Sequence, residues 1–223
     1  MIESAVHFAG APWLAEEIRA LGLSAKFVPV PALLPAWNPP SLPKRPAFVT
    51  YIPEGREEFY GWPFVLQAAI CLSHVRFLVL KHGPIPNAPA NVEFLGDLDF
   101  ATMPSVYAQA TGLIRLPEHD GMSLMVLEAL SYGRQVIWNY PFEGCHPCRR
   151  DSASLIRSIE ECAATDEPNH RGKSAVDDLR PDRVLERLTC AFEKVLDIPS
   201  RAPPWSARIA RLVGGIVMKA PRR

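Results

Sequence analysis

Two acidic side chains, Asp120 and Glu128, have the spacing that most suggests a chemical role. They lie in RLPEHDGMSLMVLEALSYGRQVIW, residues 115–138, whose pattern predicts a strand, a tight turn, a helix and another strand. Side chains eight residues apart on one helix lie on roughly the same face. The carboxyl end of a parallel strand is also where open α/β sheets bind ligands. The alternative is that Asp120 caps the helix and Glu128 lies on a solvated face.

The turn also brings backbone amide groups to this place. The helix predicted over Met122–Tyr132 leaves unpaired N–H groups near Gly121, Met122 and Ser123. A helix N-terminus carries partial positive charge, which suits a phosphate or a polarised hydroxyl. His119, beside Asp120, is either a ligand contact or a solvated side chain.

Two further motifs could hold a metal. Cys145-His146-Pro147-Cys148 has the spacing of zinc and redox sites, but one such pair alone is weak evidence, and we predict a loop near the ligand cleft. Asp97-Leu98-Asp99 falls between a predicted strand and a predicted helix, where aspartates commonly form turns or caps. We expect no metal and no other cofactor.

Composition and missing motifs exclude several function classes. The 24 basic and 24 acidic residues balance, which argues against a nucleic-acid binder. The sequence contains neither Gly-x-Ser-x-Gly nor a Gly-rich phosphate loop ending in Gly-Lys-Ser/Thr. No apolar run approaches the roughly 18 residues of a membrane span, and we expect no signal peptide. The five cysteines are an odd number, so a reducing cytoplasm fits best.

The rest of the body must position these residues, and its pattern alternates strands with helices. Non-alternating apolar runs predict buried strands, and periodic stretches between them predict helices. The predicted strands are 47–52, 75–80, 92–95, 112–116 and 135–138, and the predicted helices are 57–72, 104–110, 122–132, 152–164, 181–196 and 204–218. The polar stretch 165–178 is predicted to be a surface loop. This order predicts an α/β fold with a Rossmann-like parallel sheet flanked by helices.

A proline-rich stretch separates a short front segment from this body. Seven of the 23 prolines fall between Pro29 and Pro46, which predicts an extended, stiff connector. Before it, the pattern predicts a strand, a helix and a strand over 5–8, 12–21 and 25–28. So few residues cannot enclose a core alone.

The body resembles the nucleotide-sugar-binding domain of retaining glycosyltransferases with the GT-B fold. The resemblance rests on Pro117, on Asp120 followed by the seven residues Gly121–Leu127 and then by Glu128-Ala129, and on Gly133 and the strand after it. Asn91–Gly96 and 103–116 also resemble that family, and the similarity covers about residues 47–145. The family's first acid is usually glutamate, whereas this chain has aspartate.

The resemblance implies a nucleoside diphosphate sugar as donor. It implies that Asp120, with the amides of Gly121–Leu124, faces the sugar, and that Glu128 binds the ribose hydroxyls. It also implies that Arg56 binds the diphosphate. The implied donor-site residues are Asp120, Glu128, Arg56, His119, Gly121, Met122, Ser123 and Leu124. Where the family has a lysine this chain has Tyr60, and Lys81 and His82 are the alternative cations.

The resemblance also implies a domain organisation. Residues 1–46 correspond to a remnant of the acceptor domain and the linker, 47–200 to the donor domain, and 201–223 to a basic amphipathic tail helix. The expected function is a retaining glycosyltransferase with an unknown acceptor. The alternatives are a non-catalytic nucleotide-sugar-binding or partner subunit of a split enzyme and a nucleotide-sugar epimerase.

The expected partners follow from the front segment and the tail. A short acceptor-domain remnant leaves room for a partner chain that carries the acceptor domain. The tail has six basic and no acidic residues from Arg201 onward, together with an apolar stripe. It either packs on the body or docks on a partner or an anionic membrane surface. We therefore expect a cytoplasmic protein, with peripheral contact at the inner membrane surface as an option.

Overall fold

The computed structural model describes residues 6–32 and 40–196. Its contacts divide the chain into two compact units, one formed by Met1–Pro31 with Leu179–Arg223 and the other by Ala32–Asp178. The predicted tail 201–223, with its helix 204–218, lies outside the described residues, as do Pro35 and Pro39. This division groups 179–196 with the front segment, whereas the sequence-based boundaries place them in the donor domain. Those boundaries stay a prediction.

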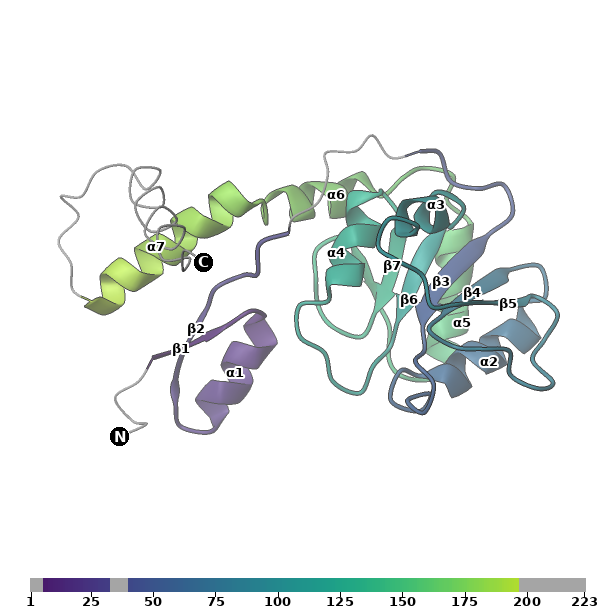
Figure 1. Cartoon of the computed structure of the whole chain (residues 1–223), viewed down its shortest axis with the longest axis horizontal. Coiled ribbons are helices and arrows are strands. Elements are labelled where there is room, and N and C mark those ends of the chain that lie inside the picture. Colours follow the sequence, from purple (N-terminus) through teal and green to yellow (C-terminus); the bar gives the residue numbers. More distant parts are fainter. Residues whose placement is uncertain (1–5, 33–39, 197–223) are drawn as a thin grey trace, which may run out of the picture. The chain divides into compact units, whose positions relative to one another are not determined.

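The larger unit is built on one six-stranded sheet. Its spatial order is β5-β4-β3-β6-β7-β8, and all neighbouring strands are parallel (Figure 1). The strands are β3 (Ala47–Tyr51), β4 (Arg76–Leu80), β5 (Val92–Gly96), β6 (Gly112–Arg115), β7 (Gln135–Trp138) and β8 (Cys145–Pro147). The first five lie where the sequence predicts them. Strands β3, β4, β6 and β7 are mostly buried, and strands buried on both faces need apolar side chains on both sides. The predicted Rossmann-like parallel sheet is confirmed.

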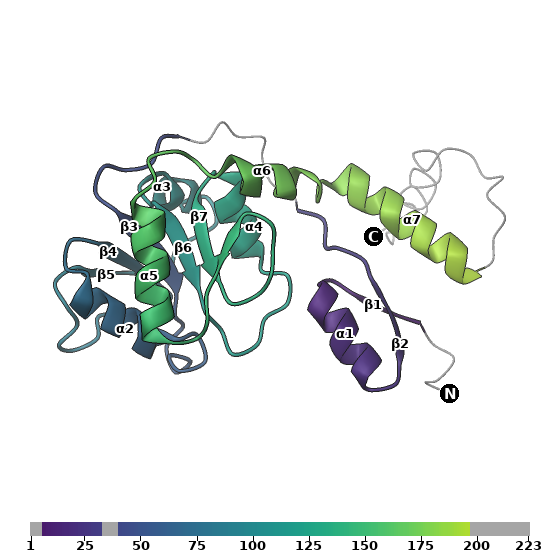
Figure 2. The same cartoon turned by 180° about the vertical axis from the view of Figure 1, so that it is seen from behind.

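Helices cover both faces of this sheet (Figures 1 and 2). One face carries α2 (Trp62–Cys71) and α5 (Ser152–Ala163), whose apolar side chains join those of β3, β4 and β6 in the main core. The other carries α3 (Met103–Ala108), α4 (Leu124–Ser131) and α6 (His170–Asp177), with α4 packed on β6, β7 and α6. The fully buried core includes Phe48, Ile52, Val65, Phe77, Ile114, Ile137, Leu155 and Ile159.

A buried arginine fixes the amino-terminal edge of the sheet. Arg134, directly after the glycine that ends α4, donates to the carbonyls of Tyr132 and Ala110, at 3.0 Å each, and to that of Pro40. Burial lowers the pKa of Arg134 to about 10. Several carbonyl acceptors compensate the buried guanidinium, and they attach the end of the proline-rich stretch to the sheet.

The smaller unit contains the predicted strand–helix–strand of the front segment and one long helix. β1 (Val6–Ala9) pairs in parallel with β2 (Ser24–Phe27), and α1 (Pro12–Ala20) connects them. In α7 (Pro181–Leu196), the Phe192 ring lies 5.1 Å from the Phe8 ring. The small core contains Ala9, Ala15 and Ala25, with Leu14 and Ile18 packed against it.

The prediction of a loop over 165–178 is wrong, because α6 occupies most of that stretch. The Asn169 side chain accepts a hydrogen bond from the Gly172 amide at 2.8 Å and so caps the helix. Gly172 is buried against Leu130 of α4, where a side chain would collide. One cap and one close contact therefore stabilise this helix. Because neither needs a regular apolar pattern, the sequence of α6 shows little apolar periodicity.

Two other expectations also need correction. The loop predicted for Cys145–Cys148 is largely strand β8, which pairs with β7 through Cys145 opposite Val136. The helix predicted over 57–72, with an interruption near Gly61 and Pro63, begins only at Trp62, after Gly61 in the left-handed conformation at φ 80°. Residues between β3 and α2 therefore form a turn-rich loop above the carboxyl end of the sheet.

Candidate functional site

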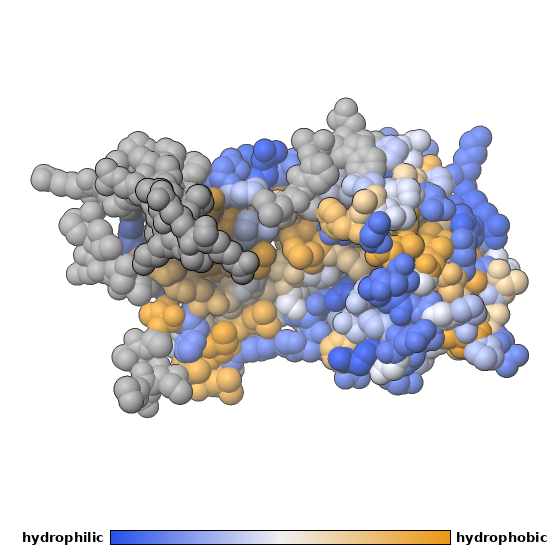
Figure 3. All heavy atoms as spheres, in the orientation of Figure 1, coloured by the Kyte–Doolittle hydropathy of each residue, from blue (hydrophilic) through white to orange (hydrophobic). Residues whose placement is uncertain are grey.

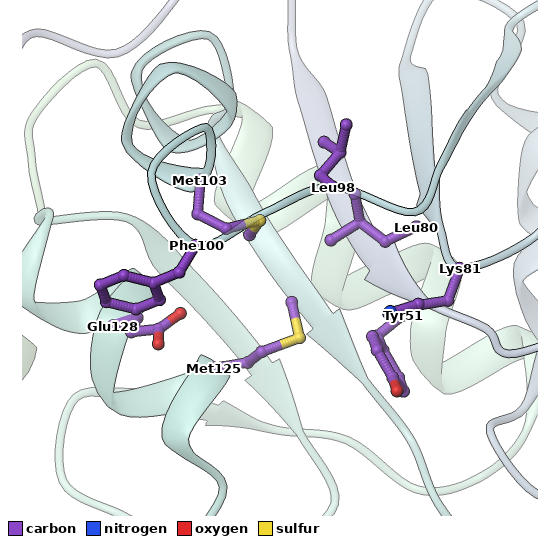
Figure 4. Close-up of a pocket in the computed structure, with 8 residues that line it drawn as sticks. All are labelled: Tyr51, Leu80, Lys81, Leu98, Phe100, Met103, Met125 and Glu128. Carbon is purple, nitrogen blue, oxygen red and sulfur yellow. The ribbon is translucent and has the colours of Figure 1, made fainter.

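A pocket of about 220 Å³ lies at the carboxyl ends of β3 and β4 (Figure 4). Tyr51 and Lys81 mark the ends of these two strands, and α4 contributes two further wall residues. The lining consists of Tyr51, Leu80, Lys81, Leu98, Phe100, Met103, Met125 and Glu128. The wall is thus mainly apolar with two charged groups, a combination typical of small-molecule sites.

Glu128, predicted from the sequence, lines this pocket. Figure 4 shows it on the side of Phe100, across the pocket from Tyr51. Its carboxylate accepts a hydrogen bond from the Tyr107 hydroxyl at 3.0 Å. Burial raises the pKa of Glu128, and the Tyr107 hydrogen bond opposes part of that rise. An acid held in an apolar wall with a fixed orientation is prepared to accept hydrogen bonds from a ligand.

Tyr107 was not among the residues predicted for the site. It comes from α3, and its ring stacks on Tyr132 at 5.2 Å. Burial and the neighbouring Glu128 carboxylate raise the pKa of Tyr107 well above its ordinary value. The hydroxyl therefore keeps its proton and serves as a donor to Glu128. A smaller pocket of about 120 Å³ is lined by Tyr107, Tyr132 and Glu128, among others.

Asp120 lies in the turn after β6 and precedes α4. The helix begins at Leu124, with Ser123 as its N-cap residue, so the expectation that Asp120 caps the helix is wrong. The argument that places Asp120 and Glu128 on one helical face fails for the same reason. The Asp120 carboxylate instead faces Arg115, and its backbone amide donates to the Tyr140 hydroxyl at 3.1 Å.

Arg115, the last residue of β6, is the second site residue that sequence reasoning missed. Its Nε and Nη2 donate to the two carboxylate oxygens of Asp120 at 2.9 and 3.2 Å. Its guanidinium carbon lies 5.6 Å from the centre of the Tyr51 ring and 5.2 Å from that of Tyr60. A charged residue directly at the carboxyl end of a buried strand is the signal that could have identified it.

The remaining turn residues lie as follows. His119 is exposed, Gly121 and Met122 are half-buried, Ser123 is buried and Leu124 is exposed. Because α4 begins at Leu124, the amides of Gly121, Met122 and Ser123 precede the helix. The first-turn amides are those of Leu124 and the residues after it, later in the chain than the sequence predicts.

Arg56 stands in the loop between β3 and α2. Its side chain is exposed, and its guanidinium carbon lies 4.4 Å from the centre of the Phe59 ring. This loop is attached to the turn after β6, because the Glu118 amide donates to the Phe59 carbonyl at 2.8 Å. Arg150 strengthens the attachment by donating to the carbonyls of Leu116 and Glu58. The Arg56 loop and the acidic turn are therefore neighbours at one edge of the sheet.

The two alternative cations after β4 already have acidic partners. The Lys81 ammonium pairs with Asp97, and His82 Nε2 lies 2.8 Å from a carboxylate oxygen of Glu57. Burial alone would lower the pKa of His82, but hydrogen bonds to Gly83 and Glu57 raise it overall. Hydrogen bonds from backbone amides and from His82 lower the pKa of Glu57 to about 2.

The metal-like motifs have other roles in this structure. The Asp99 carboxylate accepts hydrogen bonds from the amide and hydroxyl of Thr102 at 2.8 and 2.5 Å. All five cysteines are free thiols. Within residues 6–32 and 40–196, no cluster of three or more histidine, cysteine or acidic side chains is arranged to hold a metal ion. No helix of that part of the chain is long and apolar enough to cross a bilayer.

Comparison with known proteins gives matches only at the level of structure. No protein-family model and no curated protein sequence matches the chain. Sucrose-phosphate synthase from Thermosynechococcus elongatus superposes with a TM-score of 0.70 at 16% identity, over 88% of this chain and 60% of that protein. The lipopolysaccharide outer core galactosyltransferase WaaB gives 0.65 at 14%, over 85% and 62%.

A third neighbour is the pneumococcal O-GlcNAc transferase GtfA, whose structure contains UDP and GlcNAc. It gives a TM-score of 0.58 at 12% identity, over 86% of this chain and 45% of that protein. The chain thus spans about half to three fifths of the length of these enzymes. The expected resemblance to GT-B glycosyltransferases is therefore confirmed as a shared fold. Most of this chain has the α/β fold found in part of such an enzyme.

Proposed function

We propose that the chain supplies the donor-binding part of a retaining glycosyltransferase that uses a nucleoside diphosphate sugar. One observation carries the proposal: the segment with Asp120 and Glu128 lies at the carboxyl edge of a sheet shared with glycosyltransferases, and Glu128 lines a pocket there. The UDP and GlcNAc in the GtfA structure support this class of donor. The donor sugar and the base are left open.

The pocket suits the nucleoside. Its apolar wall, which includes Leu98 and Met125, can pack against the flat faces of a base. The Glu128 carboxylate then accepts hydrogen bonds from the ribose hydroxyls, while Tyr107 keeps it oriented. A charged acceptor makes such bonds stronger than a neutral one does.

The turn after β6 suits the sugar. We assign the sugar to Asp120 and to the amides of Gly121, Met122, Ser123 and Leu124, with His119 beside them. Arg56 is assigned to the diphosphate, since its loop is attached to this turn. Basic side chains and amide groups can balance the diphosphate charge.

The reaction requires little covalent chemistry from side chains. The bond between the anomeric carbon and the diphosphate oxygen breaks, and its electron pair stays on that oxygen. An acceptor hydroxyl oxygen bonds to the anomeric carbon from the same face, and its proton passes to the departing diphosphate. The site contributes by holding the donor, and a second wall must position the acceptor.

A neighbour that is itself a complex supports a second candidate function. The chain superposes on the GtfA/B complex with a TM-score of 0.64 and covers 46% of the chain that it matches there. The second candidate is a donor-binding subunit that requires a separate acceptor-binding body. The assay measures donor consumption by the purified chain, with and without a lysate fraction. Robust transfer by the purified chain to a defined acceptor would remove the subunit candidate.

Replacement of Glu128 tests the donor site. A hydrogen bond to a charged group contributes about 1.5–3 kcal/mol, so Glu128→Gln should weaken donor binding about tenfold or more. Calorimetry of the full chain against UDP-, GDP- and ADP-sugars measures the affinity. Glu160→Gln, at an exposed position of α5, is the matched control and should bind like wild type. Equal affinity of wild type and Glu128→Gln would remove Glu128 from the site.

A further inference from the structure

Arg115 is an enclosed cation at the carboxyl edge of the sheet. Its side chain is 12% exposed, compared with 39% for Lys81 and 26% for Arg150. The Tyr51 and Tyr60 rings hold the guanidinium through cation–π contacts. Because these contacts restrict its orientation, the planar group loses little further freedom when it binds a ligand.

The ion pair with Asp120 uses only part of this guanidinium. Arginine has five N–H donors, and two of them bond to Asp120 through Nε and Nη2. Within residues 6–32 and 40–196, Nη1 makes no hydrogen bond, and it is not one of the buried polar atoms that lack a partner. Asp120 compensates the enclosed charge while the site is empty, and the edge formed by Nη1 is available to an anion.

The position of Arg115 relative to the two acids indicates which group of a ligand its Nη1 edge would contact. Arg115 pairs with Asp120 on one side, and on the other it stacks on Tyr51, which lines the pocket with Glu128. In a nucleoside diphosphate sugar the diphosphate joins the sugar to the ribose. If Asp120 faces the sugar and Glu128 the ribose, the diphosphate crosses the place where Arg115 lies.

We propose that Arg115 binds the diphosphate of the donor through the guanidinium edge that Asp120 leaves open. The inference rests on the proposed function and adds a diphosphate-binding residue on β6 to Arg56 in the loop after β3. The planar fork of arginine matches two phosphate oxygens at once, which a lysine ammonium cannot do. Asp120 keeps the fork in place and weakens its charge until the donor arrives.

The test compares a nucleoside diphosphate with its nucleoside. Calorimetry of the full chain uses UDP and uridine, with GDP and guanosine, and ADP and adenosine, as parallel pairs. Arg115→Gln should weaken binding of the diphosphate about tenfold or more and leave that of the nucleoside unchanged. Asp120→Asn removes the competing carboxylate and should strengthen diphosphate binding severalfold, because UDP lacks the transferred sugar that Asp120 is proposed to contact.

A double variant protects the test against misfolding. Arg115→Gln alone takes the Arg115 charge away from the enclosed Asp120 carboxylate, whereas Arg115→Gln with Asp120→Asn removes both charges. The double variant should lose diphosphate affinity as Arg115→Gln does. Diphosphate affinity equal to that of Asp120→Asn would overturn the inference, and so would an equal loss for nucleoside and diphosphate. If wild type binds no member of any pair, the proposed function itself fails.

Discussion

The two units of this chain differ in what their side chains can bury. In the larger unit, phenylalanine, isoleucine, leucine and tryptophan fill the space between the sheet and its helices. In the smaller unit, the core cluster is alanine, with only the partly buried Leu14 and Ile18 packed against it. Figure 3 shows apolar atoms gathered over α1, β1 and β2, and mixed colours on the visible face of the larger unit. Alanine buries little apolar area, so the larger unit holds most of the stability and the whole candidate site.

This comparison predicts a large difference between two phenylalanine truncations. Phe48 on β3 is fully buried in the main core, so Phe48→Ala should lower the free energy of unfolding by about 3–5 kcal/mol. Phe8 on β1 is half-buried and contacts Phe192, so Phe8→Ala should leave the larger unit unchanged. Urea unfolding together with hydrogen exchange of the β3 and β6 amides measures both effects. Comparable loss of protection in the two variants would contradict the comparison.

The packing of α6 on α4 gives a smaller expected effect. Gly172→Ala places a methyl group against Leu130 and Asn169, so it should destabilise the larger unit by about 1–3 kcal/mol. Ser174→Ala, at an exposed position of the same helix, is the control and should change stability by less than about 0.5 kcal/mol. Thermal unfolding compares the two variants. Equal melting temperatures would mean that the contact of Gly172 with Leu130 is not tight enough to exclude a methyl group.

The elements of the larger unit differ in how far the sequence alone predicts them. Strands β3, β4, β6 and β7 could be predicted because burial on both faces requires mostly apolar residues. The edge strand β5, which contains the exposed Glu93, could be predicted from its short run of apolar residues ended by Gly96. Helix α6 could not, because only Gly172 and Val176 are buried in it and its cap depends on a turn. Strand β8 could not, because three residues that contain a proline carry no strand pattern and its order comes from β7.

The residues of the candidate site also differ in whether the sequence alone indicates them. Glu128 could be predicted because the position of its helix after a buried strand is visible in the sequence. Tyr107 could not, because it reaches Glu128 from another helix 21 residues earlier. The pairing of Arg115 with Asp120 could not either, because it depends on the path of a turn that no periodicity describes.

The smallest expected effect concerns stability against pH, and its sign separates a binding role from a structural one. The pKa of Glu128 is raised from its ordinary value of 4.5, chiefly by burial. The folded chain therefore holds this proton more tightly than the unfolded chain. Its contribution to stability is fully present below pH 4.5 and is lost as pH rises through the folded pKa.

Glu128→Gln should accordingly raise the free energy of unfolding at pH 7 relative to wild type and have little effect near pH 4. Glutamine keeps an acceptor for Tyr107, and it removes the enclosed charge. Urea unfolding at both pH values measures the difference. A variant less stable than wild type at pH 7 would indicate that the carboxylate is held for structure.

Hydrogen exchange of the full chain with and without UDP, GDP or ADP tests the donor site most directly, since it locates the ligand without a mutation. We predict slower exchange with one of these nucleotides in peptides that cover 51–61, 80–82 and 120–128, which form the pocket and the acidic turn. Peptides of β1, α1 and β2 should not change. Protection confined to the smaller unit, or no protection with any of the three nucleotides, would contradict a nucleoside diphosphate site at the carboxyl edge of the large sheet.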